Sequence, residues 1–523
     1  MSQHAFQLLV TRPILLGLLI AGALLAAAPA AGASTVYEFS AGGRLTPRDD
    51  PAVPPAFFSD PPGPPSLRGA ACAGVQPPVE EASSAVKRAV SVARSRHQIT
   101  ADEAAGYNRD YDAARRGRAR IGGTNRAELS SVIGTLERIA SRGQLSGGRM
   151  PALFLQLRRN TEFWTGDPKF PPRTDIPAEP CQPASTGGGR AGARISFPSS
   201  ELILQYYPGQ GLQIQPLGNF GKANGLYTQC STHKSGCDVD ALRKLLDELV
   251  AIRSGRGGFT TWEYWFYFSG GTPPWTSGMA DATAIQALAR GSKYLHVPAY
   301  MKVARSALGV FDKSAPVGVR VRGEGGGAHY LLYSFATGER VLNAFMQTLN
   351  GLYDYYALSH DKHALRLFRE GDRSARRELP RYDTGAWTRY DLGGAEASLN
   401  YHALATDIVK HLCKRTKMTT YCRYAKRFSG YLTTPTSVHY VGQRKVGAGS
   451  RTSLAFTIDK VSCVTVKVTD GSGRRVYRGQ ARFSRGRHAF TWKPRSPGSY
   501  TLGLSVLDLK KNHTDLSLPI AVR

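Results

Sequence analysis

The chain lacks the short motifs that mark many hydrolase and nucleotide-binding sites. Gly-x-Ser-x-Gly, His-Glu-x-x-His, a phosphate-binding loop and a dinucleotide-type glycine pattern placed after a strand are all missing from its 523 residues. The glycine-rich run at 323–327 is not followed by the Lys-Ser or Lys-Thr that phosphate binding needs. These absences remove nucleophile-elbow serine hydrolases, zinc proteases and P-loop nucleotidases from the expected functions.

Acidic residues are scarce in this chain. There are 39 Asp and Glu against 68 Lys and Arg, a formal net charge of +29. At 41% hydrophobic and 20% charged residues, the composition is that of a globular protein with a packed core. The charge favours an anionic partner, although basic side chains on ordinary solvated faces explain it equally well.

Long apolar runs are rare as well. The run at 14–28 follows Arg12 and ends at Ala31-Gly32-Ala33, which is the pattern of a secretory signal peptide. We therefore expect residues 1–33 to be a signal peptide and the mature protein to be secreted, an uncleaved anchor being the alternative. No other stretch is apolar and long enough to span a bilayer, so we expect no stable membrane span after cleavage.

The seven cysteines suit an oxidising compartment, and no Cys-x-x-Cys pair occurs. We therefore expect no zinc site, and no acidic loop calls for another metal. We expect local disulfide loops between Cys230 and Cys237 and between Cys413 and Cys422. Cys72 and Cys181 are candidates for a third bridge, and Cys463 is expected to be buried and inert.

Composition divides the rest of the chain into four parts. Residues 34–78 are rich in proline and predict an extended linker, and residues 79–195 predict a helical region followed by a loop. Residues 196–434 begin with a β-hairpin pattern and continue as amphipathic helices with long loops, which favours an α/α toroid. Residues 435–523 alternate apolar and polar side chains, which predicts an Ig-like β-sandwich.

The predicted sandwich is itself basic. Residues 436–523 contain 16 Lys and Arg against 4 Asp and Glu, a net charge of +12. Such a unit either holds an anionic polymer or is a basic accessory module.

Aromatic residues gather in the loops between residues 259 and 402. Exposed aromatic rings beside basic side chains suit sugar rings that carry negative charge. Taken singly, each tyrosine is more often a half-buried packing residue with a bonded hydroxyl group.

In their order and spacing, several segments resemble the C-terminal catalytic region of the D-glucuronyl C5-epimerases. The resemblance covers roughly residues 196–430, under half of the chain. It rests on Val341-Leu342-Asn343-x-Phe345-Met346 with Gly351-Leu352-Tyr353-Asp354, on Tyr382-Asp383-Thr384-Gly385 with Tyr390-Asp391-Leu392, and on Tyr401-His402. The hairpin from Tyr206 to Gln215 and the helix entry from Trp275 to Gln286 are also similar.

The resemblance implies which residues carry the chemistry. Three tyrosines correspond to those implicated in catalysis in that family: Tyr333, Tyr390 and Tyr401. For substrate binding we expect Arg389, Asn343, Arg320 and Arg322 as carboxylate ligands, His402 beside Tyr401, and Trp262, Tyr264 and Trp275 as stacking platforms. Four positions depart from the family pattern: Leu332 replaces an acidic residue, Gly393 an arginine, Ser334 a proline and Ala344 a glycine.

The expected reaction inverts C5 of a glucuronate unit in an anionic uronic-acid polysaccharide, without a cofactor and without nucleic acid as a partner. A proton acceptor on one face of the sugar and a donor on the other are needed, and a tyrosine whose pKa is lowered by a nearby cation serves either role. Tyr390 beside Arg389 and Tyr401 beside His402 are the expected pair, with Tyr333 positioning the sugar.

Three other functions stay open. A polysaccharide lyase abstracts the same C5 proton and then expels the substituent at C4. A toroid glycoside hydrolase needs two carboxylates, for which the candidates are Glu263, Glu324, Glu339, Asp383 and Asp391. A secreted protein that binds polyanionic glycans without catalysis would suit the departures from the family pattern and the basic charge.

Overall fold

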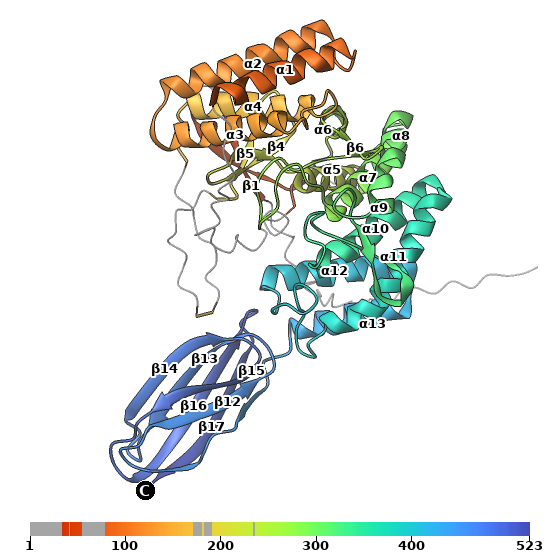
Figure 1. The fold of residues 1–523 in the computed structure, drawn as a ribbon. Coiled ribbons are helices and arrows are strands. Elements are labelled where there is room, and N and C mark those ends of the chain that lie inside the picture. The colour runs from red at the N-terminus through yellow and green to blue at the C-terminus, as the bar shows by residue number, and fades with distance from the viewer. Residues whose placement is uncertain (1–33, 41, 55–78, 171–179, 182–190, 234–235) are drawn as a thin grey trace, which may run out of the picture. The chain divides into compact units, whose positions relative to one another are not determined.

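The computed structural model describes residues 34–40, 42–54, 79–170, 180–181, 191–233 and 236–523 (Figure 1). The predicted signal peptide and the part of the predicted linker after residue 54 lie outside the described residues. The described chain mixes helices and β-sheets, in agreement with the coarse expectation from the sequence.

The first helices of the chain pack on one another. They are α1 (Val79–Ser95), α2 (Ala101–Arg120), α3 (Gly123–Ser141) and α4 (Met150–Thr165). Helix α2 begins at a capping box, in which the Glu103 backbone N–H donates to Thr100 Oγ1 and the Thr100 backbone N–H donates to Glu103 Oε2. Buried Leu129, Ile133 and Leu136 line the inner side of α3.

A five-stranded sheet lies next to these helices in the fold. Its order is β2-β1-β3-β4-β5, with β1 (Ser34–Phe39), β2 (Leu45–Asp50), β3 (Arg194–Ser196), β4 (Ile203–Tyr207) and β5 (Gly211–Ile214). The expectation of a linker is therefore wrong for residues 34–50. They form an antiparallel hairpin, and β1 pairs in parallel with β3, so that partners distant in sequence create these strands.

Helix α3 holds the hairpin of β4 and β5 through one buried carboxylate. Glu128 accepts hydrogen bonds from the Tyr206 hydroxyl and from the backbone N–H groups of Gly209 and Gly211, each at 2.8 Å. Gly211 has φ +71°, and a Cβ there would lie 2.5 Å from the Asn160 side chain, so only glycine fits this turn. The hairpin leads into the site described below.

The following helices form consecutive pairs. Their bounds are α5 (Pro216–Ser231), α6 (Val239–Ala251), α7 (Gly278–Tyr294), α8 (Pro298–Ala307), α9 (Gly309–Asp312), α10 (Leu342–Ser359), α11 (Lys362–Tyr382), α12 (Leu399–Thr416) and α13 (Thr419–Tyr431). Helices α5, α7, α10 and α12 contact one another in that order, and each also contacts the helix that follows it, α6, α8, α11 or α13. Two short hairpins interrupt the series: β6 (Ser254–Arg256) with β7 (Phe259–Thr261), and β8 (Arg320–Arg322) with β9 (Ala328–Tyr330).

Helices α7 and α10 pack closely against each other. A Cβ added at Gly351 of α10 would lie 2.3 Å from the Ala282 carbonyl oxygen of α7, so this position requires glycine. Most side chains of α7 are buried. This close approach fixes the middle of α10 against α7.

The C-terminal strands form two sheets around one core. A three-stranded sheet has the order β10-β12-β15 and a five-stranded sheet the order β11-β17-β16-β13-β14. The strands are β10 (Val438–Tyr440), β11 (Lys445–Val446), β12 (Thr452–Ile458), β13 (Ser462–Thr469), β14 (Arg475–Phe483), β15 (Gly486–Trp492), β16 (Gly498–Asp508) and β17 (His513–Val522). Buried Val464, Val466 and Val468 alternate with outward side chains along β13, as a sandwich strand requires.

The disulfides differ in part from the sequence expectation. Cys230–Cys237 and Cys413–Cys422 form, as predicted. The expectation of an unpaired Cys463 is wrong, because Cys463 bonds to Cys181 across a sequence separation of 282 residues. That bond leaves the proposed Cys72–Cys181 bridge without its second cysteine, and Cys72 lies outside the described residues.

A search of the described residues for a helix with the length and hydrophobicity of a membrane span finds none.

We predict that Glu128→Ala destabilises the protein by roughly 3–5 kcal/mol, because two backbone N–H groups and a buried hydroxyl lose a charged acceptor. Urea denaturation followed by far-UV circular dichroism measures the change. Glu162→Ala is the control, because Glu162 forms a partly exposed i,i+3 ion pair with Arg159 and should lose less than about 1 kcal/mol. Equal denaturation midpoints for the two variants would contradict the role given to Glu128.

Candidate active site

An aromatic pocket lies where four helices begin. Its cavity volume is about 50 Å³. Its lining residues are Tyr207, Gln215, Leu217, Tyr264, Phe266, Phe268, Trp275, Ser277, Met279, Leu332, Tyr333, Asn343, Tyr390, Tyr401 and Leu404. None of these side chains is charged.

The N-terminal ends of α5, α7, α10 and α12 supply several of these residues. Gln215 and Ser277 are the N-caps of α5 and α7, Asn343 is the second residue of α10, and Tyr401 is the third residue of α12. Each helix N-terminus carries a partial positive charge of about half an elementary charge. The pocket therefore favours an anion although no cationic side chain lines it.

The structure brings together the three tyrosines named from the sequence. The rings of Tyr390 and Tyr401 meet edge to face, with centroids 4.8 Å apart. The hydroxyl groups of Tyr333 and Tyr390 are hydrogen-bonded to each other. Residues that lie up to 68 positions apart in the chain thus form one cluster on the pocket wall.

Burial makes these tyrosines weaker acids. It raises the pKa of Tyr333 well above 10, and the neighbouring Tyr390 and Tyr401 raise it further. Burial also raises the pKa of Tyr390, but the hydrogen bond from Tyr333 opposes this rise. Both hydroxyls are therefore weak acids, and an oxygen anion on one of them would need the other as a hydrogen-bond donor to stabilise it.

A second aromatic pair lines the pocket. The rings of Tyr264 and Trp275 stack at 4.1 Å, and the Tyr264 hydroxyl donates to Gln215 Oε1 at 3.1 Å. The same oxygen accepts from the Leu217 backbone N–H. Because Gln215 Oε1 has two donors, its amide nitrogen is left as the group that can bind a ligand.

Asn343 and the substituted position Leu332 also face the pocket. Asn343 is 4% exposed and its Nδ2 lies 3.9 Å from the Met279 sulfur, a weak contact that leaves its amide available to a ligand.

The position of the family's arginine is Gly393, whose φ of +88° disfavours any residue with a Cβ. A charged side chain in place of Gly393 would therefore strain the backbone.

The three arginines expected to bind a carboxylate do not line the pocket. Arg389 Nη1 donates to the Gly394 carbonyl oxygen, Arg320 pairs with Glu370 at 2.6 Å, and Arg322 is exposed on β8. Arg389 is also not among the groups that shift the pKa of Tyr390. The expectation that it activates Tyr390 finds no basis in this arrangement.

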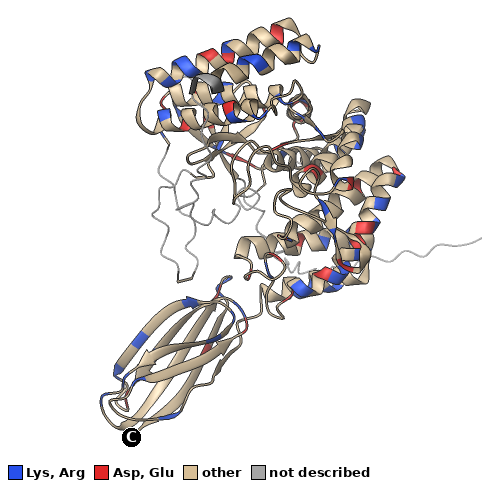
Figure 2. Ribbon diagram, viewed as in Figure 1, with Lys and Arg blue, Asp and Glu red and all other residues tan. Residues whose placement is uncertain are grey.

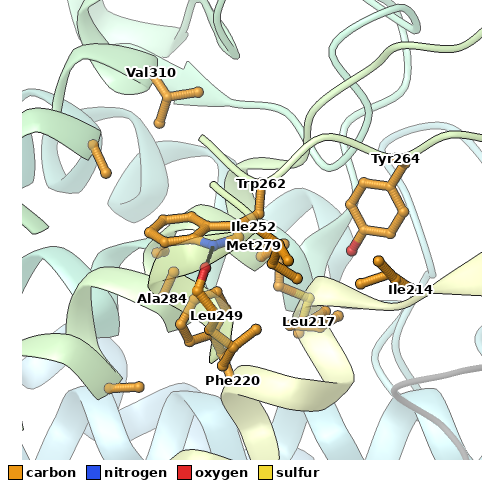
Figure 3. Close-up of a cluster of buried hydrophobic side chains, with 14 of the residues drawn as sticks. Ile214, Leu217, Phe220, Leu249, Ile252, Trp262, Tyr264, Met279, Ala284 and Val310 are labelled. Carbon is orange, nitrogen blue, oxygen red and sulfur yellow. Dashed lines mark hydrogen bonds between the residues drawn. The ribbon is translucent and has the colours of Figure 1, made fainter. Parts of the chain in front are cut away.

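Trp262 and His402 lie in the core, because each is held by buried partners. Trp262 is 2% exposed and its Nε1 donates to the Leu249 carbonyl oxygen at 2.7 Å (Figure 3). His402 is fully buried, stacks on Trp387 and lies 3.1 Å from the Phe428 carbonyl oxygen through Nε2. Both were expected to contact substrate, but neither side chain lines the pocket.

Sequence reasoning missed Tyr207, Gln215 and Ser277 as pocket residues. Tyr207 and Gln215 lie in the hairpin segment that resembles the family, so attention to that segment would have found them. Ser277 has the signature of a helix N-cap, and the Ala280 backbone N–H donates to its Oγ. Because helix capping alone explains a serine at this position, the sequence pattern does not indicate that Ser277 also lines the pocket.

Among the described residues, no group of three or more His, Cys, Asp or Glu side chains is placed to hold a metal ion. The candidate carboxylates for a hydrolase do not line the pocket either. Glu263, for example, is buried between Arg149 and Arg256 at 2.7 Å from each.

Comparison with known proteins points to one family. Residues 256–430 match the family described as D-glucuronyl C5-epimerase C-terminus. A D-glucuronyl C5-epimerase of Caenorhabditis elegans is 34% identical over 179 residues, which is 30% of this chain and 29% of that protein. The chain thus matches less than a third of that relative's length.

Solved structures are similar only at a low level. A D-mannose isomerase has a TM-score of 0.32 and 11% identity, over 44% of this chain and 63% of its own. A family 76 glycoside hydrolase from a bovine Bacteroides thetaiotaomicron strain has a TM-score of 0.30 and 13% identity, over 45% and 51%. Similarity at this level does not bear on activity.

The burial of His402 predicts an acid-sensitive fold. Burial lowers its pKa to about 4, whereas an unfolded histidine titrates near 6.5. The folded state therefore binds a proton at His402 less tightly than the unfolded state does. The contribution of His402 to the free energy of unfolding is fully present above about pH 6.5, and it falls by roughly 3 kcal/mol as the pH drops towards 4.

The variant His402→Gln removes this titration, and denaturant unfolding at a series of pH values measures it. We expect a flatter dependence of stability on pH between about 4 and 6.5 than in the parent. His439→Gln, at an exposed histidine, is the control and should keep the parental slope. If His402→Gln also kept that slope, His402 would not be a buried neutral side chain.

Proposed function

We propose that the protein is a uronosyl C5-epimerase, because residues 256–430 match the family described as D-glucuronyl C5-epimerase C-terminus, in agreement with the resemblance seen in the sequence. Its proposed substrate is a glucuronate-containing polysaccharide. The observation that carries the proposal is the meeting of Tyr333, Tyr390 and Tyr401 in one neutral pocket at four helix N-termini.

The reaction is difficult because the hydrogen at C5 is a very weak acid. Removing this proton next to a carboxylate gives an enediolate that carries a second negative charge on the same group. Groups that stabilise charge as it develops lower such a barrier more than groups that bind the ground state.

The pocket offers that stabilisation without a cation. The partial charges at the N-termini of α5, α7, α10 and α12 act in a largely buried, aromatic surrounding, where electrostatic interactions are strong. The amides of Asn343 and Gln215 supply neutral donors for the carboxylate oxygens. The stacked rings of Tyr264 and Trp275 offer an apolar face for the sugar ring.

In the proposed mechanism Tyr390 accepts the C5 proton, and Tyr333 donates a hydrogen bond to the Tyr390 oxygen. Tyr401 returns a proton from the other face of the sugar, which inverts the carbon. Because burial raises the pKa of Tyr390, only a small fraction is ionised at neutral pH. The rate should therefore rise with pH through neutrality and into the alkaline range.

The wider architecture fits a polymer-modifying enzyme. We infer that the consecutive helix pairs from α5 to α13 are part of an α/α toroid and that the C-terminal sandwich is of the Ig-like type. We also infer that the protein is secreted. The three disulfides support this localisation, since such bonds persist in oxidising compartments.

The test of the proposal is exchange of the C5 hydrogen. In deuterated water, the protein should replace the C5 proton of a glucuronate polymer with deuterium, read as loss of its NMR signal and the appearance of iduronate-type signals. The exchange rate should still be rising at pH values near 10, the usual pKa of a tyrosine. An ultraviolet-absorbing unsaturated product would show a lyase instead, and absence of any exchange would remove the epimerase proposal.

Two tyrosine variants separate the proposed roles. Tyr390→Phe should slow both exchange and inversion by about 10²–10⁴-fold, the usual contribution of a proton-transfer group. Tyr401→Phe should keep exchange with retention of configuration and lose inversion, because the abstracted proton can return only from its original face. Tyr424→Phe, in α13 and away from the pocket, is the matched control and should behave as the parent. Equal losses of exchange in both pocket variants would contradict this division of roles.

A further inference from the structure

The outward face of β14 carries a row of cations. In β14 the side chains of Tyr477 and Phe483 pack against the sandwich core, so the alternate residues Arg478, Gln480 and Arg482 point outward. Figure 2 shows basic residues along this strand. β14 is also an edge strand of its sheet.

A β-bulge adds one more cation to this row. The register of β13 and β14 pairs Val468 with Tyr477 but Thr469 with Arg475, so Val476 is the extra residue. Without the bulge, Arg475 would share the inward face with Tyr477. With it, Arg475 lies opposite the outward Thr469, which is the kind of side-chain re-aiming that bulges produce.

The neighbouring strand β13 extends the row into a patch. Lys467 is exposed and lies directly opposite Arg478. We call Lys467, Arg475 and Arg478 the sheet patch. Like charges directly opposite each other in a sheet are destabilising, so this pairing costs stability.

Acidic partners for the patch are missing from the described part of the chain. Lys467, Arg475 and Arg478 form no ion pair there, whereas Arg474 in the adjacent turn pairs with Asp470. The acidic residue on the same sheet face, Asp515, lies on β17, which is three strands away from β14, and pairs with His513. The patch is thus an uncompensated cluster of positive charge.

Protection of the edge strand against aggregation is a simpler use of such charges. It explains charge on β14 itself but not Lys467, which lies on the interior strand β13. An anionic ligand explains both, because arginine forks and a lysine ammonium bind carboxylates.

The rest of this sheet face indicates which polyanion fits. The outward residues beside the patch are Thr465, Gln480, Thr501, Gly503, Ser505 and Ser517. They are small or polar, and none is aromatic. Surfaces that bind nucleic acid commonly stack bases on aromatic rings, and surfaces that bind membranes commonly insert apolar side chains into lipid. These outward residues offer neither kind of side chain.

We propose that the sheet patch is a second, non-catalytic binding surface for an anionic polysaccharide, with carboxylates seated on the arginines and hydroxyl groups on the polar residues between them. The choice of polysaccharide rests on the proposed function of the pocket. The surface holds the polymer that the pocket modifies, and so lowers KM for long chains without changing the chemistry at C5.

The experiment compares two triple variants of the full chain that remove the same charge. The patch variant is Lys467→Gln, Arg475→Gln, Arg478→Gln. The control variant is Arg487→Gln, Lys493→Gln, Arg495→Gln, at exposed positions of β15 and the following loop. The probe is a fluorescently labelled hyaluronan fragment, which carries a glucuronate carboxylate in every disaccharide, and binding is followed by anisotropy.

We expect the patch variant to bind hyaluronan at least about tenfold more weakly than the parent, and the control variant to bind within about twofold. Equal binding by the patch and control variants would overturn the proposal. So would tighter patch-dependent binding of duplex DNA or of phosphatidylserine vesicles than of hyaluronan, because the surface would then serve another partner.

This design separates the two proposals. If patch-dependent binding is found but no polymer undergoes C5 exchange, the proposed function fails and the binding surface stands. If C5 exchange is found but the patch variant binds hyaluronan as the parent does, the binding surface fails and the proposed function stands.

Discussion

The convergence of four helix N-termini is the constraint on which the site depends. Helices α5, α7, α10 and α12 pack side by side in that order, and each begins at the same aromatic pocket. Their partial charges give the pocket an affinity for anions that no lining side chain supplies. Helices α7 and α10 approach closely at Gly351, and the carboxylate of Glu128 holds the β4–β5 hairpin that precedes α5.

A pocket of this kind changes the expected chemistry of its tyrosines. A cation beside a tyrosine would lower its pKa and hold it ionised, whereas burial among aromatic rings raises the pKa of Tyr333 and Tyr390. The hydrogen bond from Tyr333 lowers the pKa of Tyr390 and so acts against burial there, whereas it raises the pKa of Tyr333 further. Tyr390 is therefore a strong base when ionised but is seldom ionised, which favours a slow enzyme with an alkaline optimum.

Local patterns in the sequence predicted the elements better than the contacts between them. Apolar periodicity found the helices, and alternation found the sandwich strands, because both depend on neighbouring residues. The strands at 34–50 were missed, since they form by pairing with β3 far along the chain. The motifs placed Tyr333, Tyr390 and Tyr401 at the pocket, but no pattern says whether Trp262 faces a pocket or a core.

Binding of a glucuronate disaccharide and of its methyl ester, compared by calorimetry, tests the central claim most directly. The ester keeps the sugar and removes the charge. If helix ends and neutral amides form a site for a carboxylate, the acid binds at least about tenfold more tightly than the ester, and Asn343→Leu reduces this difference. Equal affinity for the two compounds would contradict an anion site at the four helix N-termini.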